Sequence, residues 1–512
     1  METIEATVTK SSRTYDRSKL FIIKDKVYDL TDWIDKHPGG AKWFQRSVCR
    51  DISVAIYAYH KEPHKLERIL KRYETDLQPS EIANFFAKVP EFLKGEDFDE
   101  TKDVLTYDWS KKDGFLKTLR SRINTASFQA KIKKADLLFD IVSVVILVSH
   151  ILMMFVGVPY EILPLWGYVL FFTISRTALA AVGHYHCHRK KNGISDWGDA
   201  LFDMQYVGFS IILYDGHVMG HHFYTNSRAD VKRTVFTGML ELPRLFRVPV
   251  MTLQKFGQFF TGYFIRWNEV LKEEKDGYNP IKFYQLLFVR LLLLAEFIFC
   301  MAAGYWLLWA LQFITTTWFN LFLIVSSHDF EEPETHADLS HGQDWGVFQV
   351  ENSFDMSVVG NGYIDCFLTA GLGTHRSHHV LPDQRSGFAN ILSNKIVKQT
   401  WEEFGHEWAR TRNFLVDRFP KLFVHYMFSP VRIAEGPPGP RPPGPPPPHA
   451  APPPPRPKPP GPRPDNPYTL EPENPDNSTI KTTGFFAENF SRQSFKTMWH
   501  FIYVGFKGIG SI

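Results

Sequence analysis

The chain lacks three features, and each absence excludes a class of protein. Its four cysteines are scattered over 512 residues and form no C-x-x-C pair, so we expect reduced thiols in a chain whose working parts face the cytosol. The net charge of +3 gives no signal for a nucleic acid partner. Residues 1–20 contain no apolar run of the kind that a signal peptide needs, so any insertion into a membrane must depend on internal segments.

Long apolar segments, by contrast, occur four times and in two pairs. Residues 141–160 contain no Lys, Arg, Asp or Glu, and residues 162–183 contain only Arg176. The second pair covers residues 283–304 and 305–327. Each segment is long enough to cross about 30 Å of hydrocarbon as a helix that rises about 1.5 Å per residue. We therefore expect an all-α polytopic membrane domain with four transmembrane helices in two hairpins.

The charges around these segments predict their orientation. Basic residues flank the first pair on both outer sides, at 131–134 and 189–191, and neither tight turn contains Lys or Arg. By the positive-inside rule, both ends of each hairpin should lie in the cytosol. Arg290 and Glu296 interrupt the third segment, so we expect them to pair or the helix to begin later. Residues 200–214 are apolar but too short to span, which favours a buried or interfacial segment.

The other parts of the chain are more polar. Residues 1–75 have the composition of a small soluble domain, and residues 76–135 form a polar linker. Residues 435–467 have low complexity, with 19 of the 34 prolines between 437 and 467. We expect this segment to be disordered or extended polyproline II, acting as a stiff spacer or docking an SH3- or WW-type partner. Residues 468–512 follow it as a C-terminal tail.

Histidine is concentrated in three short stretches. Nine of the 20 histidines lie in "GHYHCHRKK", "GHVMGHHFYTN" and "THRSHHVLP". With the predicted topology, all three stretches fall on the cytosolic side of the membrane. The histidines are His184, His186 and His188 in the first, His217, His221 and His222 in the second, and His375, His378 and His379 in the third.

The spacing of these histidines suits metal binding. On a helix, His184 and His188 share one face, whereas His186 points nearly opposite and is left out of the site. His217 and His221 repeat the spacing of four, and neutral imidazole is a good ligand for iron, zinc or copper. His328, just after the last apolar segment, adds a ninth candidate. Nine ligands exceed the tetrahedral set of one zinc ion, so two metals are the simpler account.

A carboxylate-rich di-iron bundle is not supported. Such a bundle would show two Glu-x-x-His motifs on different helices. The sequence offers Glu403 and His406 and no second pair. The predicted centre is therefore rich in histidine and lies at a membrane surface.

These three stretches resemble the three histidine boxes of membrane fatty acyl desaturases. The resemblance covers roughly residues 136–430 and includes "DWGVFQVENS" at 344–353, which is similar to the stretch before the third box in that family's front-end and acyl-lipid branch. Front-end members usually open the third box with glutamine, where this chain has His375. The resemblance implies a di-iron centre that uses O₂ and two electrons to remove two hydrogens from a fatty acyl chain. The ligands that it implies are His184, His188, His217, His221, His222, His375, His378 and His379, with His328 as the ninth.

The N-terminal region resembles cytochrome b5 over residues 15–75. "VYDLTDWIDKHPGGAKWF" at 27–44 reads as a strand, a short helix and a tight turn, and a domain of this kind would be α+β. In the resembled family, the histidine of His-Pro-Gly-Gly is an axial ligand of haem b, which implies His37 here. The second axial ligand should lie a little over 20 residues later, where His60 fits and His64 is the competitor.

Together, these parts resemble the cytochrome b5-fused desaturases, among them the animal cytochrome b5-related proteins. The resemblance implies a multi-pass protein of the endoplasmic reticulum membrane with its termini and histidine boxes in the cytosol. It also implies NADH-cytochrome b5 reductase as electron donor. A b5-fused fatty acid or sphingolipid hydroxylase and a non-catalytic haem- or metal-binding membrane protein remain as alternatives.

Overall fold

The structure is a computed structural model that describes most of the chain outside the proline-rich segment. His328 and residues 435–467 lie outside the described residues. The described residues are 7–10, 13–37, 41, 43–44, 47, 51–82, 104–110, 113–188, 195–207, 213–227, 230, 237–262, 283–326, 342–431 and 489–506.

The N-terminal region combines short hairpins and helices, as the sequence predicts. Strand β1 (Thr7–Lys10) pairs antiparallel with β2 (Arg13–Asp16), and β3 (Leu20–Ile23) pairs antiparallel with β4 (Lys26–Asp29). Three α-helices follow: α1 (Thr31–Ile34), α3 (Ser53–Tyr59) and α4 (Pro63–Leu70). Phe21, Ile34, Phe44 and Ile56 are among the side chains that form the core between them. The domain is small and α+β.

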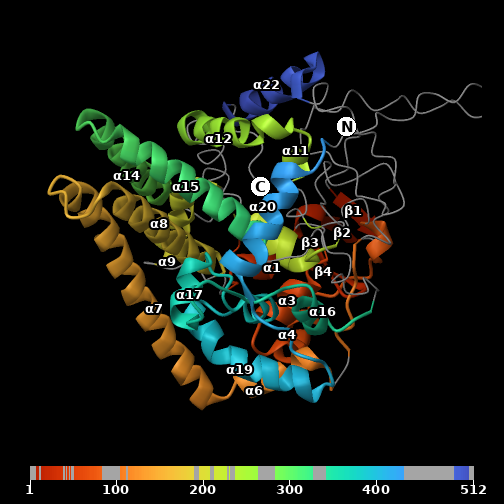
Figure 1. Ribbon diagram of the computed structural model, residues 1–512. Coiled ribbons are helices and arrows are strands. Elements are labelled where there is room, and N and C mark those ends of the chain that lie inside the picture. Colours follow the sequence, from red (N-terminus) through yellow and green to blue (C-terminus); the bar gives the residue numbers. More distant parts are fainter. Residues whose placement is uncertain are drawn as a thin grey trace, which may run out of the picture.

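Four long helices form a bundle on the left of Figure 1. Helix α7 (Ala126–Leu152) continues through a π-helical turn to Gly157, and α8 (Leu165–Cys187) returns beside it. Helices α14 (Phe283–Ala302) and α15 (Trp306–Val325) form the second hairpin. Buried apolar side chains of all four helices share one core, and α7 exposes a row of leucines and valines on its outer side.

Three helices of the described chain are long and apolar enough to cross a membrane. They are Ala126–Gly157, Leu165–Cys187 and Trp306–Val325. Helix α14 matches the predicted segment 283–304 in position and is 20 residues long, and its role as a fourth span stays a prediction. The first helix also begins at Ala126, 15 residues before the apolar run that predicted it.

We expected Arg290 and Glu296 to pair with each other, or the helix to begin later. Both charges lie inside α14, and each pairs with a different residue. The Arg290 guanidinium lies 3.2 Å from the Asp203 carboxylate, next to the bundle. Glu296 pairs with the Arg176 guanidinium of α8 and lies 3.0 Å from Nε2 of His150 in α7. Each charge therefore has an opposite charge in the protein interior, which removes much of the cost of burying it.

Shorter elements cover the end of the bundle where the histidine clusters lie. Residues 199–205, from the segment predicted to be buried or interfacial, form a buried 3₁₀-helix, η6, that packs on α8. The shorter α-helices are α6 (Phe115–Ile123), α9 (Ser195–Gly198), α10 (His222–Tyr224), α11 (Thr237–Leu240), α16 (Trp345–Glu351), α17 (Gly362–Leu368), α18 (His375–Val380), α19 (Gly387–Glu403) and α20 (Phe419–Phe428). The other short elements are the π-helices η8 (Leu213–His221), η11 (Gln258–Gly262) and η13 (Phe414–Arg418), and the parallel strands β5 (Met356–Ser357) and β6 (Arg412–Asn413).

The C-terminal helix α22 (Arg492–Phe506) returns to the desaturase-like part and packs on α12 (Arg247–Gly257), at the top of Figure 1. Two glycines allow the close approach. A Cβ at Gly257 would lie 2.7 Å from the Phe506 ring, and a Cβ at Gly505 would lie 2.5 Å from the Gln254 carbonyl oxygen.

Candidate metal centre

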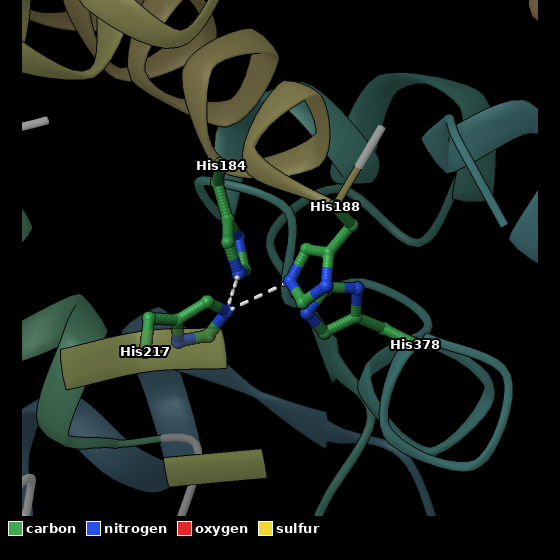
Figure 2. A group of neighbouring side chains, drawn as sticks. All are labelled: His184, His188, His217 and His378. Atoms are coloured by element: carbon green, nitrogen blue, oxygen red, sulfur yellow. Dashed lines mark hydrogen bonds between the residues drawn. The ribbon is translucent and has the colours of Figure 1, made fainter. Parts of the chain in front are cut away.

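Four histidines from all three clusters form a first group. His184 lies in α8, His188 caps that helix, His217 comes from η8 and His378 from α18. One ring nitrogen of each lies within 4.8 Å of the others, and all four side chains are buried. Nε2 of His217 is 2.8 Å from Nε2 of His184 and 3.1 Å from Nε2 of His188. Figure 2 shows the four rings converging from the end of α8 and from two other segments.

Three more histidines form a second group beside the first. His221, His375 and His379 place one ring nitrogen each within 4.8 Å of one another, and all three are buried. Nε2 of His379 and Nε2 of His375 are 3.0 Å apart. His375, which replaces the usual glutamine at the start of the third box, thus lies within this group. Seven of the eight clustered histidines that the sequence analysis retained fall into the two groups.

The eighth, His222, lies between the groups. Its Nε2 is 3.0 Å from Nε2 of His217 in the first group. Its ring stacks on that of His379 in the second, with centroids 4.2 Å apart and planes 19° apart. Burial, together with the nearby His188 and His378 imidazoles, lowers the pKa of His222 well below its usual range. His222 is therefore a neutral imidazole, the form that binds metals.

We expected the spacing of four residues to place His217 and His221 on one face of a helix, and the structure differs. His217 belongs to the first group and His221 to the second, although they are four residues apart. The cause is local, because residues 213–221 form a π-helix. A π-helix has more residues per turn than an α-helix, so side chains four residues apart do not lie on one face. His375 and His378, three apart on α18, are likewise divided between the groups. One short segment therefore supplies ligand-type nitrogens to two neighbouring places.

Three of the imidazoles have their ring orientation and tautomer fixed by a hydrogen bond from Nδ1. His184 donates to the Ala370 carbonyl oxygen at 2.9 Å, His221 to the Asp230 carboxylate at 2.8 Å and His379 to the Gln349 side-chain oxygen at 2.8 Å. In each case Nε2 keeps its lone pair. Histidines that bind metals almost always donate their other ring N–H in this way.

Asp230 and Ala370 were missed by the sequence analysis. Asp230 follows the second cluster closely, so a search for an acid just beyond each box would have found it. The role of Ala370 depends on a backbone carbonyl and leaves no signal in the side-chain pattern. The neighbouring Gly371 has φ +96°, and a Cβ there would lie 2.6 Å from Nδ1 of His184. Only glycine permits both this backbone conformation and this approach.

His186 lies away from both groups. Its ring packs against Gly198, and its Nε2 is 3.6 Å from the Asp140 carboxylate of α7. This position agrees with its exclusion from the predicted site. His328 lies outside the described residues, so its place relative to the two groups stays a prediction.

The donor set fits metal ions well. Buried imidazoles whose ring nitrogens lie within 4.8 Å of one another suit iron, zinc or copper. Because the seven ring nitrogens form two adjacent groups, the arrangement favours two ions over one.

His37 and His60 lie together in the N-terminal domain. Their ring centroids are 6.0 Å apart, and the Phe44 ring packs against His37. Nδ1 of His60 lies 3.1 Å and 3.2 Å from the Ala55 and Ile56 carbonyl oxygens, to which it donates, so Nε2 keeps its lone pair. Burial lowers the pKa of His60 and keeps it neutral. This geometry fits a pair of axial haem ligands; the side chain of His64, the competitor, lies outside what the structure describes.

Comparisons with protein families match both parts of the chain. The fatty acid desaturase family model matches residues 135–411, and the cytochrome b5-like haem/steroid binding domain model matches residues 5–75. The first match covers more than half of the chain and includes all three histidine clusters.

Individual relatives match long or short parts of the chain. The cytochrome b5-related protein of Drosophila melanogaster is 24% identical over 409 residues, covering 76% of this chain and 84% of the relative. The Delta(5) fatty acid desaturase A of Dictyostelium discoideum is 24% identical over 447 residues, covering 77% of this chain and 86% of the relative. A Neurospora crassa protein described as a cytochrome b5 is 37% identical over 68 residues, which cover 13% of this chain and 76% of that protein. No solved structure matches significantly.

Proposed function

Because the chain belongs to the fatty acid desaturase family and carries a cytochrome b5-like domain ahead of the desaturase domain, we propose that it desaturates a fatty acyl chain at a di-iron centre in an O₂-dependent reaction. The membrane desaturase activity itself, an oxidoreductase activity, follows from the family. The observation that best supports the di-iron centre is the pair of adjacent groups of buried imidazoles.

We assign the first iron to His184, His188, His217 and His378, and the second to His221, His375 and His379. His222 lies between them and would bind one of the two, and His328 would complete a ninth position. When bound, the iron pair supplies activation of O₂ and accepts electrons one at a time.

The chain's own residues prepare this centre. Ala370, Asp230 and Gln349 accept the Nδ1 protons of three ligands, so that Nε2 of each is left to bind a metal ion. The carboxylate of Asp230 would also offset part of the positive charge of an ion bound by His221. The eight described ligands are all buried, which would exclude water from the oxidant and from the apolar substrate.

In the N-terminal domain, His37 and His60 would be the axial ligands of haem b. With both axial positions filled, a haem carries electrons and does not bind O₂. The electrons would come from NADH-cytochrome b5 reductase at the cytosolic face of the endoplasmic reticulum. Fusion of this carrier to the desaturase domain raises its effective concentration at the metal centre.

We also assign α14 as a fourth membrane span. Its 20 residues can cross about 30 Å of hydrocarbon. Its two charges, Arg290 and Glu296, are buried and paired within the protein, so neither faces lipid. The hairpin of α14 and α15 would then return the chain to the cytosolic side before the third histidine cluster.

Expression with the reductase in a host that lacks b5-fused desaturases, followed by lipid mass spectrometry and metal analysis, tests the proposal. We expect an acyl product lighter by two hydrogens, lost in His221→Ala and in His37→Ala, and about two irons per protein besides haem iron. His186→Ala is the matched control, because this buried histidine faces away from both groups.

Each other outcome points to a different function. A hydroxylated lipid would favour the hydroxylase, which begins with the same hydrogen abstraction. No lipid change in a protein fully loaded with haem and iron would leave only the non-catalytic reading. Stoichiometric zinc without non-haem iron would contradict the di-iron assignment.

A further inference from the structure

The C-terminal end of helix α3 in the cytochrome b5-like domain packs directly against the desaturase domain. Val54 and Ala58 of α3 share a core with Phe223, next to the second histidine cluster, and with Val380 and Leu381, next to the third. On one side of His60, the Ala58 carbonyl oxygen accepts a hydrogen bond from Arg120, which also pairs with Asp383 at 2.6 Å.

On the other side, the Lys61 carbonyl oxygen accepts a hydrogen bond from the Asn124 amide at 2.7 Å. Both anchors, Arg120 and Asn124, belong to helix α6 and its cap, and they bracket the residue that we assign as an axial haem ligand. The position of His60 relative to the metal centre is therefore fixed by specific hydrogen bonds.

Tyr59 lies at the point where the two domains meet. It is bonded to His60 in the chain, and its ring lies nearly parallel to that of His188, with centroids 6.5 Å apart and planes 14° apart. The Phe223 ring lies 6.4 Å away on the same side. Tyr59 is therefore linked through the backbone to a proposed haem ligand, His60, and its ring lies beside that of a proposed iron ligand, His188.

The phenol of Tyr59 has no visible role in acid–base chemistry. Its hydroxyl is buried and makes no hydrogen bond to the described residues. Without a proton acceptor, oxidation of this tyrosine to a neutral radical is unfavourable. The ring can still couple its neighbours electronically, because tunnelling through a packed ring changes neither its charge nor its protonation.

We propose that Tyr59 is the bridge through which electrons pass from the cytochrome b5-like domain to the metal centre, entering at His188. The inference rests on the proposed function. In each passage the haem is oxidised by one electron and the iron pair is reduced by one electron, while Tyr59 returns unchanged. Two passages supply the two electrons needed for each acyl chain, and the reductase restores the haem electron from NADH after each.

A second row of aromatic rings offers the matched comparison. Tyr57 stacks on Trp109 at 5.0 Å, and Trp109 stacks on Trp345 at 6.3 Å. This row also connects α3 to the desaturase domain, but none of its ring contacts reaches a histidine of the two metal groups within the described structure. If Tyr59 is the bridge, interruption of this row at Trp109 should leave electron transfer intact.

The test uses the full-length protein in nanodiscs, loaded with haem and iron and kept anaerobic. The haem is reduced by a flash of photogenerated deazaflavin radical, and its reoxidation is followed in the haem absorption band. The same protein without iron gives the background rate. We expect Tyr59→Phe to keep the wild-type rate and Tyr59→Leu, which opens a gap in the packed bridge, to slow it by an order of magnitude or more. Trp109→Leu should be unchanged.

Three measurements separate a bridge from a structural role. The haem spectrum and reduction potential, and the iron content, should be the same in all variants. An equal reoxidation rate in Tyr59→Leu and wild type would overturn the role of Tyr59 as the bridge and leave the desaturase proposal standing. The same conclusion would follow if only Trp109→Leu slowed the reoxidation. A loaded wild-type protein whose haem is not reoxidised faster than the iron-free protein would overturn the proposed function together with the bridge.

Discussion

At the scale of single residues, the orientation of three clustered imidazoles depends on hydrogen-bond acceptors outside the two groups. The acceptors for His184, His221 and His379 are a backbone carbonyl, a carboxylate and an amide. Among these, the carboxylate of Asp230 is the most informative to change, because it is charged and also accepts a hydrogen bond from the Asn226 backbone N–H at 2.8 Å. It therefore fixes both the imidazole and the chain that follows the second cluster.

We expect Asp230→Ala to lower the affinity for iron roughly 10- to 100-fold, the usual cost of losing such a partner. His221 would lose the acceptor for its Nδ1 proton, and its Nε2 would no longer be held toward His375 and His379. Equilibrium dialysis against a graded chelator, with iron measured by mass spectrometry, gives the affinity.

Asp113→Ala, which removes an exposed acid, is the control and should bind iron as the wild type does. Asp230→Asn keeps an acceptor without the charge and should fall between the two. Equal iron binding by Asp230→Ala and wild type would show that His221 is held by other contacts.

The sequence pattern predicted that the three histidine clusters lie together, which the structure shows, but not how they divide into two groups. His184 and His188 stay together because an ordinary α-helix ends at His188. His217 and His221 separate because their segment is a π-helix, and no residue type in "GHVMGHHFYTN" marks that conformation. The pairing of His221 with Asp230 is predictable in principle from proximity in the chain, whereas that of His184 with Ala370 joins segments 186 residues apart.

At the scale of elements, apolar runs predicted the positions of the long helices but not their full lengths. Helix α7 begins 15 residues before its apolar run. The added turns carry Lys131, Lys133 and Lys134, and Asp136 accepts a hydrogen bond from Ser386 at 2.7 Å, near the third cluster. This part is helical because it packs on α19, which is a tertiary effect that local composition does not record.

A buried polar network connects all four long helices of the bundle. Arg176 of α8 pairs with Glu296 of α14 and donates from Nε to the Gln312 side chain of α15 at 2.7 Å. His150 of α7 contacts Glu296 through Nε2 at 3.0 Å and Ser175 through Nδ1 at 2.7 Å. Since every member is buried, removal of one charge leaves the other without compensation.

We expect Glu296→Leu to destabilise the membrane domain by about 3–5 kcal/mol, because it leaves the Arg176 charge buried and unpaired. The double variant with Arg176→Met should recover much of that loss, since replacing both charges by apolar groups removes the penalty. Thermal unfolding in detergent, followed by intrinsic fluorescence, measures the effect.

The haem absorption band shows in parallel whether the cytochrome b5-like domain stays folded. Glu161→Leu, a change of an exposed acid in the turn between α7 and α8, serves as the control. A double variant less stable than Glu296→Leu would show that the network contributes more than charge compensation.

At the scale of the whole molecule, Tyr107 and Trp109, in the polar linker predicted at residues 76–135, lie at the interface between the two domains. Trp109 lies between Tyr57 of the N-terminal domain and Trp345 of α16, and Tyr107 donates to the Phe223 carbonyl oxygen at 3.2 Å. The composition of the linker alone suggested a simple connection. The residues that these rings contact lie far away in the sequence, so composition could not predict the contacts. The arrangement places the cytochrome b5-like domain on the same end of the bundle as the histidine clusters.

That arrangement leads to a prediction about membrane topology. The apolar helix that contains α7 has 32 residues, more than the roughly 20 needed to span a bilayer, so its basic first turns should project into the cytosol beside α19. The turn at Tyr160, which is 78% exposed, would lie on the luminal side, and Lys398 on α19 would lie in the cytosol.

Single cysteines at these positions report the orientation. Cys187, Cys300 and Cys366 are buried, so only Cys49, which lies outside the described residues, needs replacement by serine in the parent protein. In intact microsomes, a membrane-impermeant maleimide should label Lys398→Cys at once and Tyr160→Cys only after detergent opens the vesicles. Labelling of Tyr160→Cys in intact vesicles would place the first hairpin's turn in the cytosol. The first histidine cluster, at the end of α8, would then lie in the lumen, on the other side of the membrane from the reductase that supplies the electrons.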